Sequence, residues 1–568
     1  MSDILRIGNA SGFLGDRFSA VQEMLTGGEL DVLTGDYLAE LTMLILGRQR
    51  MKDPARGYAN TFLRQMEANL GEAVQREVTI VVNAGGLNPA GLAEKLRELA
   101  GRLGLDVAVA HVEGDDLLPR AEELGFPGAL TANAYLGAFG IAECLRAGAD
   151  VVVTGRVTPD ASLVVGPGIA RFGWGPADLD ALAGAVVAGH VLECGTQATG
   201  GNFAPPAVLK PDFDLGHAGF PIAELHADGS SVITKHAGTD GLVSVDTVTA
   251  QLLYEIGGAR YGGPDVTTRF DTIALAQDGL DRVRISGVRG EAPPPTTKVC
   301  VNTLSGFRNE MTFALTGGDI EAKDALIRAQ LEAALPTRPA SLRWTLSRLD
   351  IPDAPTQVQA TGLLRCAVTD PDPKVVGRAF SGAVIELALA SIAGFHVLAP
   401  PGDAQPVAKY APFYVDNADA AHLAVLPDGE RRPIPALPVT QALAEVPDPP
   451  LPAAPDGPTR RVPLGTAFGA RAGDKGGDCN VGVWAASEAG YAWLARHLTP
   501  ERVRELMPET AELEIRRTLL PNLRAVNLVL VGLLGEGVSS AYRFDPQGKA
   551  VGEWLRSRHV DLPEELLS

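Results

Sequence analysis

The chain of 568 residues is 46% hydrophobic and 21% charged, which excludes a disordered or fibrous protein and leaves room for about two to four structural units. Its net charge of −20 disfavours nucleic acid and anionic membranes as partners, because phosphate binding requires a basic face. The 64 glycines and 41 prolines follow no period, so they indicate many tight turns rather than collagen.

Cysteine usage and the N-terminus indicate the compartment. Five cysteines lie far apart and form no CxxC pair, which argues against a disulfide framework or a structural zinc site and favours a reducing compartment. The first residues lack the basic and apolar segments of a signal peptide, and no run of about 18 apolar residues predicts a membrane span. We therefore expect a soluble, cytoplasmic protein.

The first third of the chain alternates between strand-like and helix-like segments. Apolar runs at 78–82, 105–110 and 150–154 predict strands, and the stretch 131–147 predicts a helix. Short continuous apolar strands that alternate with helices are typical of a largely parallel sheet covered by helices on both faces. Such sheets bind ligands beyond the carboxyl ends of their strands, where this chain has polar, glycine-rich loops.

The remaining chain divides into further regions. The stretch from about 205 to 430 is less regular, with a helix expected at 243–254, and we interpret it as a second subdomain that begins near 205. Nine prolines between 433 and 459 predict an extended linker, because proline fits neither a helix interior nor a sheet interior. We thus expect an α/β body over 1–432 and a small α+β domain over 460–568.

Several motifs resemble one known family, that of acyclic terpene utilisation (AtuA). The motifs that resemble its body are the glycine-rich segments 6–16, 31–40, 82–89, 155–160 and 189–203, and the segment 470–480 resembles the ferredoxin-fold domain that often follows that body. The resemblance implies an α/β body with a C-terminal ferredoxin-like domain. It also implies degradation of citronellol- and geraniol-like terpenoids through acyl-CoA thioesters, but it assigns no catalytic residue.

The segment 189–197 is the strongest candidate for chemistry. His190 and Glu193 stand three residues apart and would share one helix face, as a general acid/base pair or as two metal ligands with a third from elsewhere. Cys194 could act as a nucleophile if its pKa were lowered. In the alternative interpretation, His190 stabilises a helix C-terminus, Glu193 is solvated and Cys194 is a small buried hydrophobe.

A loop rich in backbone donors follows directly. Such a loop could bind a carboxylate or phosphate, or it could be a tight turn that requires glycine. It lacks the Gly-Lys-Ser/Thr of a Walker loop, which argues against nucleotide hydrolysis. The candidate ligand-binding residues here are Thr196, Gln197, Gly200, Gly201 and Asn202.

Other strand-end loops carry polar side chains that could face the same pocket. Arg156 could clamp an anion and Asp160 could act as a base or ligand, or Asp160 could cap the next helix with Arg156 as its partner. Asn9 and Ser11 follow the first short strand, in a loop whose glycine spacing does not match a dinucleotide fingerprint. Asn83 follows the strand at 78–82 in a similar loop.

Two charged loops complete the candidates. Lys235, in the polar segment 235–240, could meet an acyl carbonyl or a phosphate, although we favour the interpretation of this segment as a simple turn. Arg471 and Lys475 lie in a charged, glycine-rich loop before an apolar strand. They could bind an anion such as a CoA phosphate, or form an inter-domain contact.

These residues predict an enzyme that acts on a branched or terpenoid acyl group, with a small-molecule or CoA-linked substrate. Hydration, dehydration or C–C lyase chemistry fits acid/base residues without an evident redox cofactor, and a divalent metal stays open as an alternative. In this hypothesis Arg156 clamps the anion and the backbone of 200–202 cradles an oxyanion. We also expect a homo-oligomer. The competing hypothesis is a non-catalytic partner of acyl-CoA carboxylase-type enzymes.

Overall fold

The computed structural model describes residues 4–207 and 213–567, apart from the side chains of residue 40 and residues 159–162. The chain forms two compact units. The first comprises residues 1–302 and 410–568, and the second comprises residues 303–409. The sequence predicts a subdomain that begins near 205, whereas the boundaries of the compact units lie at 302/303 and 409/410.

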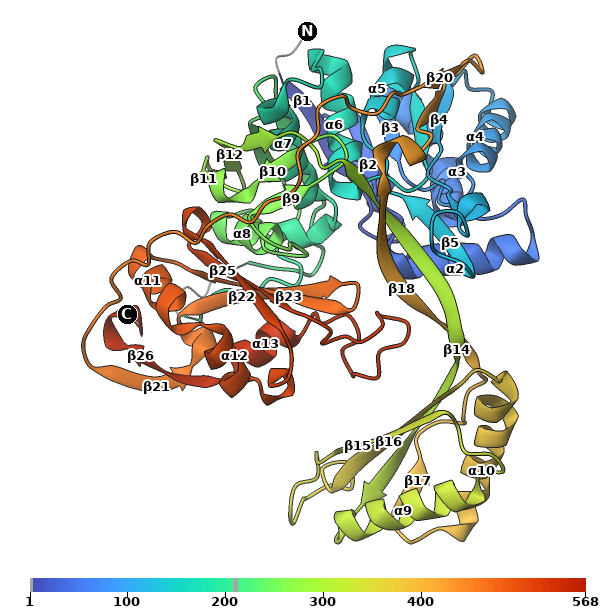
Figure 1. Ribbon diagram of the computed structural model, residues 1–568, viewed down its shortest axis with the longest axis vertical. Coiled ribbons are helices and arrows are strands. Elements are labelled where there is room, and N and C mark those ends of the chain that lie inside the picture. The colour runs from blue at the N-terminus through green and yellow to red at the C-terminus, as the bar shows by residue number, and fades with distance from the viewer. Residues whose placement is uncertain (1–3, 208–212, 568) are drawn as a thin grey trace. The chain divides into compact units, whose positions relative to one another are not determined.

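A mixed sheet organises the first unit (Figure 1). Its five central strands are parallel and are ordered β1-β2-β3-β6-β4. Antiparallel strands flank them on both sides, so the expected parallel arrangement holds only for the centre. The central strands are β1 (Ile4–Asn9), β2 (Val32–Gly35), β3 (Thr79–Val82), β6 (Val151–Thr154) and β4 (Val109–Glu113); the flanking strands are β7 (Pro221–His226), β8 (Ser231–Lys235), β12 (Val283–Ser286), β11 (Ala274–Gln277), β19 (Leu423–Val425) and β20 (Arg431–Pro433).

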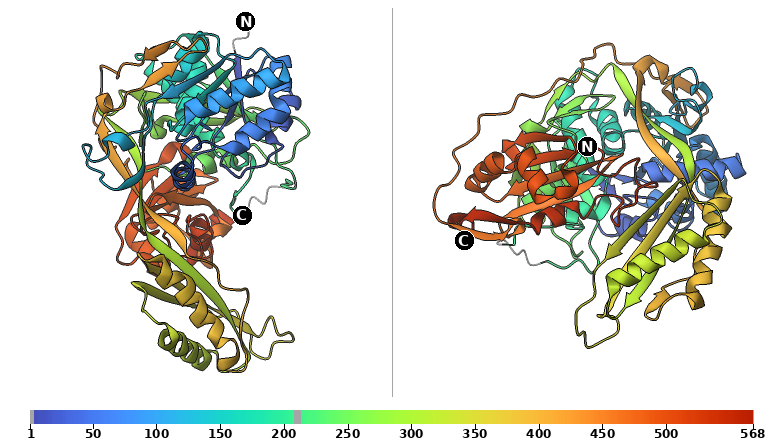
Figure 2. Two further views of the ribbon diagram at one scale, coloured as in Figure 1. Left: turned by 90° about the vertical axis from the view of Figure 1, so that its right-hand side faces the viewer. Right: turned by 60° about the horizontal axis from the view of Figure 1, so that its bottom comes forward.

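Helices bury both faces of the central strands. In β3, Ile80 and Val82 enter one hydrophobic core and Val81 enters another, because successive side chains of a strand point to opposite faces. The first core includes α3 and α4, which pack side by side (Figure 2), and the second includes α5, α6 and α7. The helices of this part are α1 (Ala20–Thr26), α2 (Glu40–Lys52), α3 (Asn60–Gln75), α4 (Pro89–Leu103), α5 (Phe139–Arg146), α6 (Pro159–Phe172), α7 (Leu179–Leu192) and α8 (Val245–Leu252).

The segment 131–147 departs from its predicted helix. Residues Ala129–Ala134 form strand β5, which pairs with β14, and α5 begins only at Phe139. The alanines of this segment favour a helix locally, but tertiary pairing outweighs that modest propensity. The helix expected at 243–254 does form, as α8.

The second unit contains an antiparallel sheet ordered β15-β16-β14-β17, on which α9 and α10 share a hydrophobic core. Its sheet also includes β18, which pairs with β14. The elements are β14 (Thr296–Thr316), α9 (Ile320–Ala334), β15 (Ser341–Ser347), β16 (Thr361–Asp370), α10 (Phe380–Ala390), β17 (Phe395–Val397) and β18 (Gln405–Asp416).

The C-terminal domain of the first unit is an antiparallel sheet ordered β22-β23-β25-β24 with helices packed on it. Residues 434–458, which precede it, contain no helix or strand. The sheet strands are β22 (Phe468–Lys475), β23 (Asp478–Ala485), β24 (Ile515–Leu520) and β25 (Ala525–Leu530); the helices are α11 (Glu488–His497), α12 (Pro500–Leu506) and α13 (Val551–Arg556); and β21 (Thr459–Pro463) pairs with β26 (His559–Pro563).

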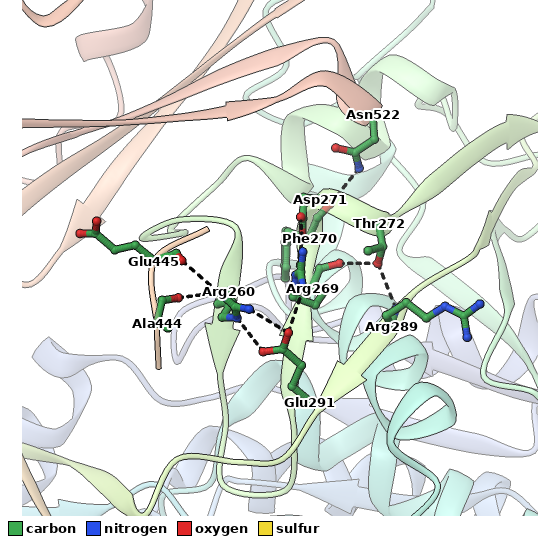
Figure 3. Close-up of polar contacts among 10 residues, drawn as sticks. All are labelled: Arg260, Arg269, Phe270, Asp271, Thr272, Arg289, Glu291, Ala444, Glu445 and Asn522. Carbon is green, nitrogen blue, oxygen red and sulfur yellow. Dashed lines mark hydrogen bonds and ion pairs between the residues drawn. The ribbon is translucent and has the colours of Figure 1, made fainter. Parts of the chain in front are cut away.

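Specific hydrogen bonds attach this domain and its preceding segment to the body (Figure 3). The side-chain amide of Asn522 donates to the carbonyls of Phe270 and Ile273, each at 2.9 Å. Arg260 forms an ion pair with Glu291 and donates to backbone carbonyls of residues 444 and 445. Arg260 and Glu291 belong to a small sheet of β9 (Arg260–Gly262), β10 (Thr267–Arg269) and β13 (Arg289–Glu291).

No helix within residues 4–207 and 213–567 combines the length and the apolar character needed to cross a membrane.

Candidate functional site

The loops after β1, β2 and β3 are joined by a buried polar network. The amide of Asn9 donates to the carbonyl of Glu193 at 3.3 Å, and the hydroxyl of Ser11 donates to the carbonyl of Asp36 at 3.0 Å. The amide of Asn83 donates to the Asp36 carboxylate at 2.6 Å and accepts the backbone N–H of Tyr37 at 2.8 Å. The structure therefore brings Asn9, Ser11 and Asn83 to one edge of the sheet, where their polar groups hold the loops together.

Arg156 lies in a second polar cluster, at the end of β6. Its guanidinium donates to the Tyr135 hydroxyl at 2.8 Å and stacks on that ring, and the Lys298 ammonium lies 4.8 Å from the same ring centroid. The backbone N–H of Arg156 donates to Asp115, and burial raises the pKa of that carboxyl to about 7. Asp160 was predicted to accompany Arg156, but its side chain lies outside the described residues.

His190 occupies the interior of the body. Its side chain is 0% exposed and meets the rings of Tyr261 and Phe270 edge-on, with centroids 5.5 Å away in each case. Its Nδ1 lies 3.5 Å from the carboxylate of Glu193, so these two residues are adjacent as the helical spacing predicts. The ring is packed between two aromatic side chains, however, which argues against the predicted role of His190 as an acid/base residue in direct contact with a substrate.

The hypothesis of a metal site at His190 and Glu193 needs a third ligand. In the described part of the chain, no three His, Cys, Asp or Glu side chains gather closely enough to hold a metal ion.

The loop after α7 is a tight turn. Residues Gly195–Thr199 form a short 3₁₀ helix, and Gly200 follows with φ +110°, a conformation that favours glycine. Asn202 also has a positive φ of 53°. The N–H of Gly201 donates to the carbonyl of Thr196 at 2.9 Å, and the N–H of Gly200 donates to another carbonyl of the turn. The predicted oxyanion cradle is therefore wrong for these two donors, because the turn itself uses them.

Lys235 is bound by polar groups of the protein itself. Its ammonium lies 3.1 Å from the carboxylate of Asp281 and donates to the carbonyl of Thr239 at 2.7 Å. The side chain is only 5% exposed. Lys235 is thus compensated by a carboxylate of the protein, which argues against the predicted contact with an acyl carbonyl or phosphate.

Arg471 meets the body at the segment that follows α7. Its guanidinium donates to the side-chain oxygen of Gln197 and stacks on Tyr254, with the guanidinium carbon 4.3 Å from the ring centroid. On the same strand, the Lys475 ammonium donates to the carbonyl of Glu255 at 2.8 Å. We call this set, together with Cys194, the Arg471 cluster. It joins the segments 189–203 and 470–480, which lie far apart in sequence. The prediction of a loop at 470–480 is wrong for most of that segment, because β22 runs to Lys475 and β23 begins at Asp478.

Glycines allow the close approach that builds this cluster. A Cβ on Gly473 would stand 2.1 Å from the ring of Tyr254, and a Cβ on Gly12 would stand 2.8 Å from the backbone of Cys194. Contacts that short do not occur between real side chains and their neighbours. The glycines of these two motifs are thus required for packing rather than for a flexible loop.

The electrostatics of the cluster centre on one buried cation. Arg471 is 3% exposed, burial lowers its pKa, and it forms no ion pair within the described residues. Burial raises the pKa of the Cys194 thiol well above its ordinary value, and the carboxylates of Glu193 and Glu255 raise it further. Cys194 is therefore held as a neutral thiol, which argues against its predicted role as a nucleophile.

Sequence reasoning missed Tyr254, Glu255 and Asp115. Asp115 lies soon after the strand predicted at 105–110, so its place beyond a strand end was an available signal. Tyr254 and Glu255 follow α8, and no motif marks them.

Family models match both regions of the chain that contribute residues to this cluster. Residues 5–426 match the model described as acyclic terpene utilisation family protein AtuA. The chain belongs to the AtuA family. Residues 462–561 match the AtuA ferredoxin-like domain, which makes the C-terminal α+β domain ferredoxin-like. The Arg471 cluster of this AtuA family member thus draws side chains from both matched regions.

Two further comparisons add little. Among solved structures, a homoserine dehydrogenase from S. aureus is similar at 11% identity, over 68% of this chain and 83% of that one, with a TM-score of 0.14. A similarity that low carries no argument about fold or function. The comparison with curated proteins gave no match.

Proposed function

We propose that the chain is an enzyme of acyclic terpenoid or branched-chain acyl catabolism that binds the acyl oxygen or carboxylate of its substrate at Arg471. The reaction we propose is hydration, dehydration or related lyase chemistry. Family membership supports the substrate class, and the single observation that carries the proposed site is the guanidinium of Arg471, which is buried and forms no ion pair within the described residues.

A buried charge needs compensation. Moving a guanidinium out of water costs several kcal/mol, roughly, and buried arginines are ordinarily paired with carboxylates. Arg471 contacts a neutral amide and an aromatic ring, and the nearby carboxylate of Glu255 acts to raise its pKa but forms no ion pair with it. An anionic ligand would supply the ion-pair partner that Arg471 lacks, and the planar fork of a guanidinium matches a carboxylate with two hydrogen bonds.

The proton transfer is assigned to Glu193. This residue precedes Cys194, and its carboxylate lies beside the imidazole of the buried His190. When water adds to an unsaturated acyl group, hydroxide goes to the β-carbon and a proton to the α-carbon, while negative charge develops on the acyl oxygen. Arg471 would stabilise that charge, and the Glu193 carboxylate would take a proton from the attacking water and then deliver it to the α-carbon. His190 would be a positioning residue behind Glu193.

Ligand binding tests the proposal through Arg471→Gln. Branched acyclic carboxylates and their CoA thioesters should raise the Tm of the native chain, since a ligand at 100 times its Kd stabilises by about 2.7 kcal/mol. Arg471→Gln should lose this shift. Arg516→Gln should keep it, because Arg516 is an exposed arginine of the same domain that pairs with Glu514. An unchanged shift in Arg471→Gln would disprove the site.

Turnover tests the chemistry separately. Glu193→Gln should bind the same ligands but lose turnover by about 10²-fold or more, the usual contribution of a general acid or base. If no ligand shifts the Tm, and the chain instead co-purifies with an acyl-CoA carboxylase-type enzyme, the non-catalytic alternative replaces this proposal.

A further inference from the structure

The C-terminal domain has a pocket that lies outside the Arg471 cluster. The pocket has a volume of about 440 Å³, within the range of about 300–1,000 Å³ that small-molecule sites occupy. It lies between the ribbon of β21 and β26 and the helix α12. Its lining residues are Arg461, Arg502, Glu505, Leu506, Arg558 and His559.

The local fold directs these side chains outward. In β26, Val560 and Leu562 enter the core, so the alternation of the strand leaves His559 exposed. In α12, Val503 and Leu506 are buried, so Arg502 and Glu505 lie toward solvent. Arg461 lies on β21, which pairs with β26. Three separate elements therefore each bring an arginine to one pocket: β21, α12 and the turn before β26.

The charge of the pocket is positive. Arg461 lies 3.5 Å from Asp561, and Arg502 lies 2.5 Å from Glu505, so these two arginines are partly neutralised. Arg558 is exposed and forms no ion pair within the described residues. This positive site belongs to a chain with a net charge of −20, in which residues 460–568 contain as many acidic as basic residues. The positive charge of the pocket therefore results from where these arginines lie and not from an excess of basic residues in the domain.

We propose that this pocket binds a phosphate group of a small soluble ligand. A phosphate carries up to two negative charges and three acceptor oxygens, so it can engage more than one guanidinium, whereas a monocarboxylate is satisfied by one. Because the three arginines come from separate elements, more than one of them can contact a doubly charged anion at the same time. The proposal does not depend on the proposed reaction, because no residue of the pocket belongs to the Arg471 cluster, although a CoA thioester is one ligand that carries such a group.

Calorimetric titration of the full chain tests it at low ionic strength. The probes are inorganic phosphate, pyrophosphate, CoA and dephospho-CoA, and the variants are Arg558→Gln and Arg461→Gln. At least one probe should bind saturably, about tenfold or more weakly in each variant, and more weakly as salt rises. Arg516→Gln is the matched control and should bind as the native chain does, because its guanidinium pairs with Glu514 outside the pocket.

The probes also distinguish the source of the phosphate. Tighter binding of CoA than of dephospho-CoA would identify the 3′-phosphate of CoA as the recognised group. Equal binding of pyrophosphate, CoA and dephospho-CoA would identify a diphosphate, and binding of inorganic phosphate alone would identify the free anion. The proposal is overturned if none of the four binds saturably, or if Arg558→Gln and Arg461→Gln bind as tightly as the native chain. Arg471→Gln should leave these titrations unchanged, so the two proposals fail independently.

Discussion

Replacing Gly473 by alanine tests the packing that positions Arg471. The added Cβ would stand 2.1 Å from the ring of Tyr254, and carbon atoms require about 3.5 Å, so ring and strand must separate by about 1.4 Å. Tyr254 is buried and cannot simply swing away. Overpacking of this kind costs about 1–3 kcal/mol.

The effect is measurable by scanning calorimetry. For a domain of about 100 residues, each kcal/mol lowers Tm by about 4–8 °C, so the transition of the C-terminal domain should fall by at least about 4 °C. The same variant should weaken the ligand-induced shift assigned to Arg471, because the guanidinium stacks on the displaced ring.

Gly552→Ala provides the matched control. Gly552 lies in α13 against β22, where the nearest atom to an added Cβ is 3.4 Å away, an ordinary contact. Alanine favours a helix over glycine by about 0.5–1 kcal/mol, so this variant should be as stable as the native chain or slightly more stable. If Gly473→Ala melts at the native temperature, Tyr254 does not pack on β22 and the account of the Arg471 cluster is wrong.

Three further predictions concern the body. Asn83→Ala should lower the free energy of unfolding by about 1–3 kcal/mol in urea titrations, because it leaves the buried N–H of Tyr37 without its acceptor. Lys235→Met should destabilise the chain by a similar amount, about 1–3 kcal/mol, because it leaves Asp281 uncompensated. The variant should keep every ligand-induced Tm shift, and loss of those shifts would show that Lys235 contributes to ligand binding. Glu113 has a pKa lowered to about 2, chiefly by its hydrogen bond to an imidazole, so its stabilising contribution is complete above the unfolded value of 4.5 and is lost as pH falls toward 2. The urea midpoint of Glu113→Gln should therefore lie below the native midpoint at pH 6, and a gap that stayed constant down to pH 3 would contradict the assignment.

Local patterns in the sequence were sufficient where neighbours in the chain determine the structure. The apolar runs at 78–82 and 150–154 contain the strands β3 and β6, and α8 forms within its predicted stretch, since periodicity and capping act over a few residues. The segment 131–147 was misjudged because its strand depends on pairing with a distant part of the chain. The place of the flanking antiparallel strands in this sheet was likewise not predicted, because they come from residues 221 onward, which the sequence assigned to a second subdomain.

For the site, the amino-acid sequence by itself determined family membership, the acidic character of the chain and the loops worth inspecting. The tertiary structure alone decided that His190 is enclosed by aromatic rings, that the backbone of Gly200 and Gly201 is committed to a turn, and that Arg471 reaches Gln197. The physical reason is that burial and charge compensation depend on residues that are distant in sequence, as His190 and Tyr261 or Arg471 and Gln197 are. The chemistry of a side chain depends on its neighbours in space, whereas a sequence motif contains only its neighbours along the chain.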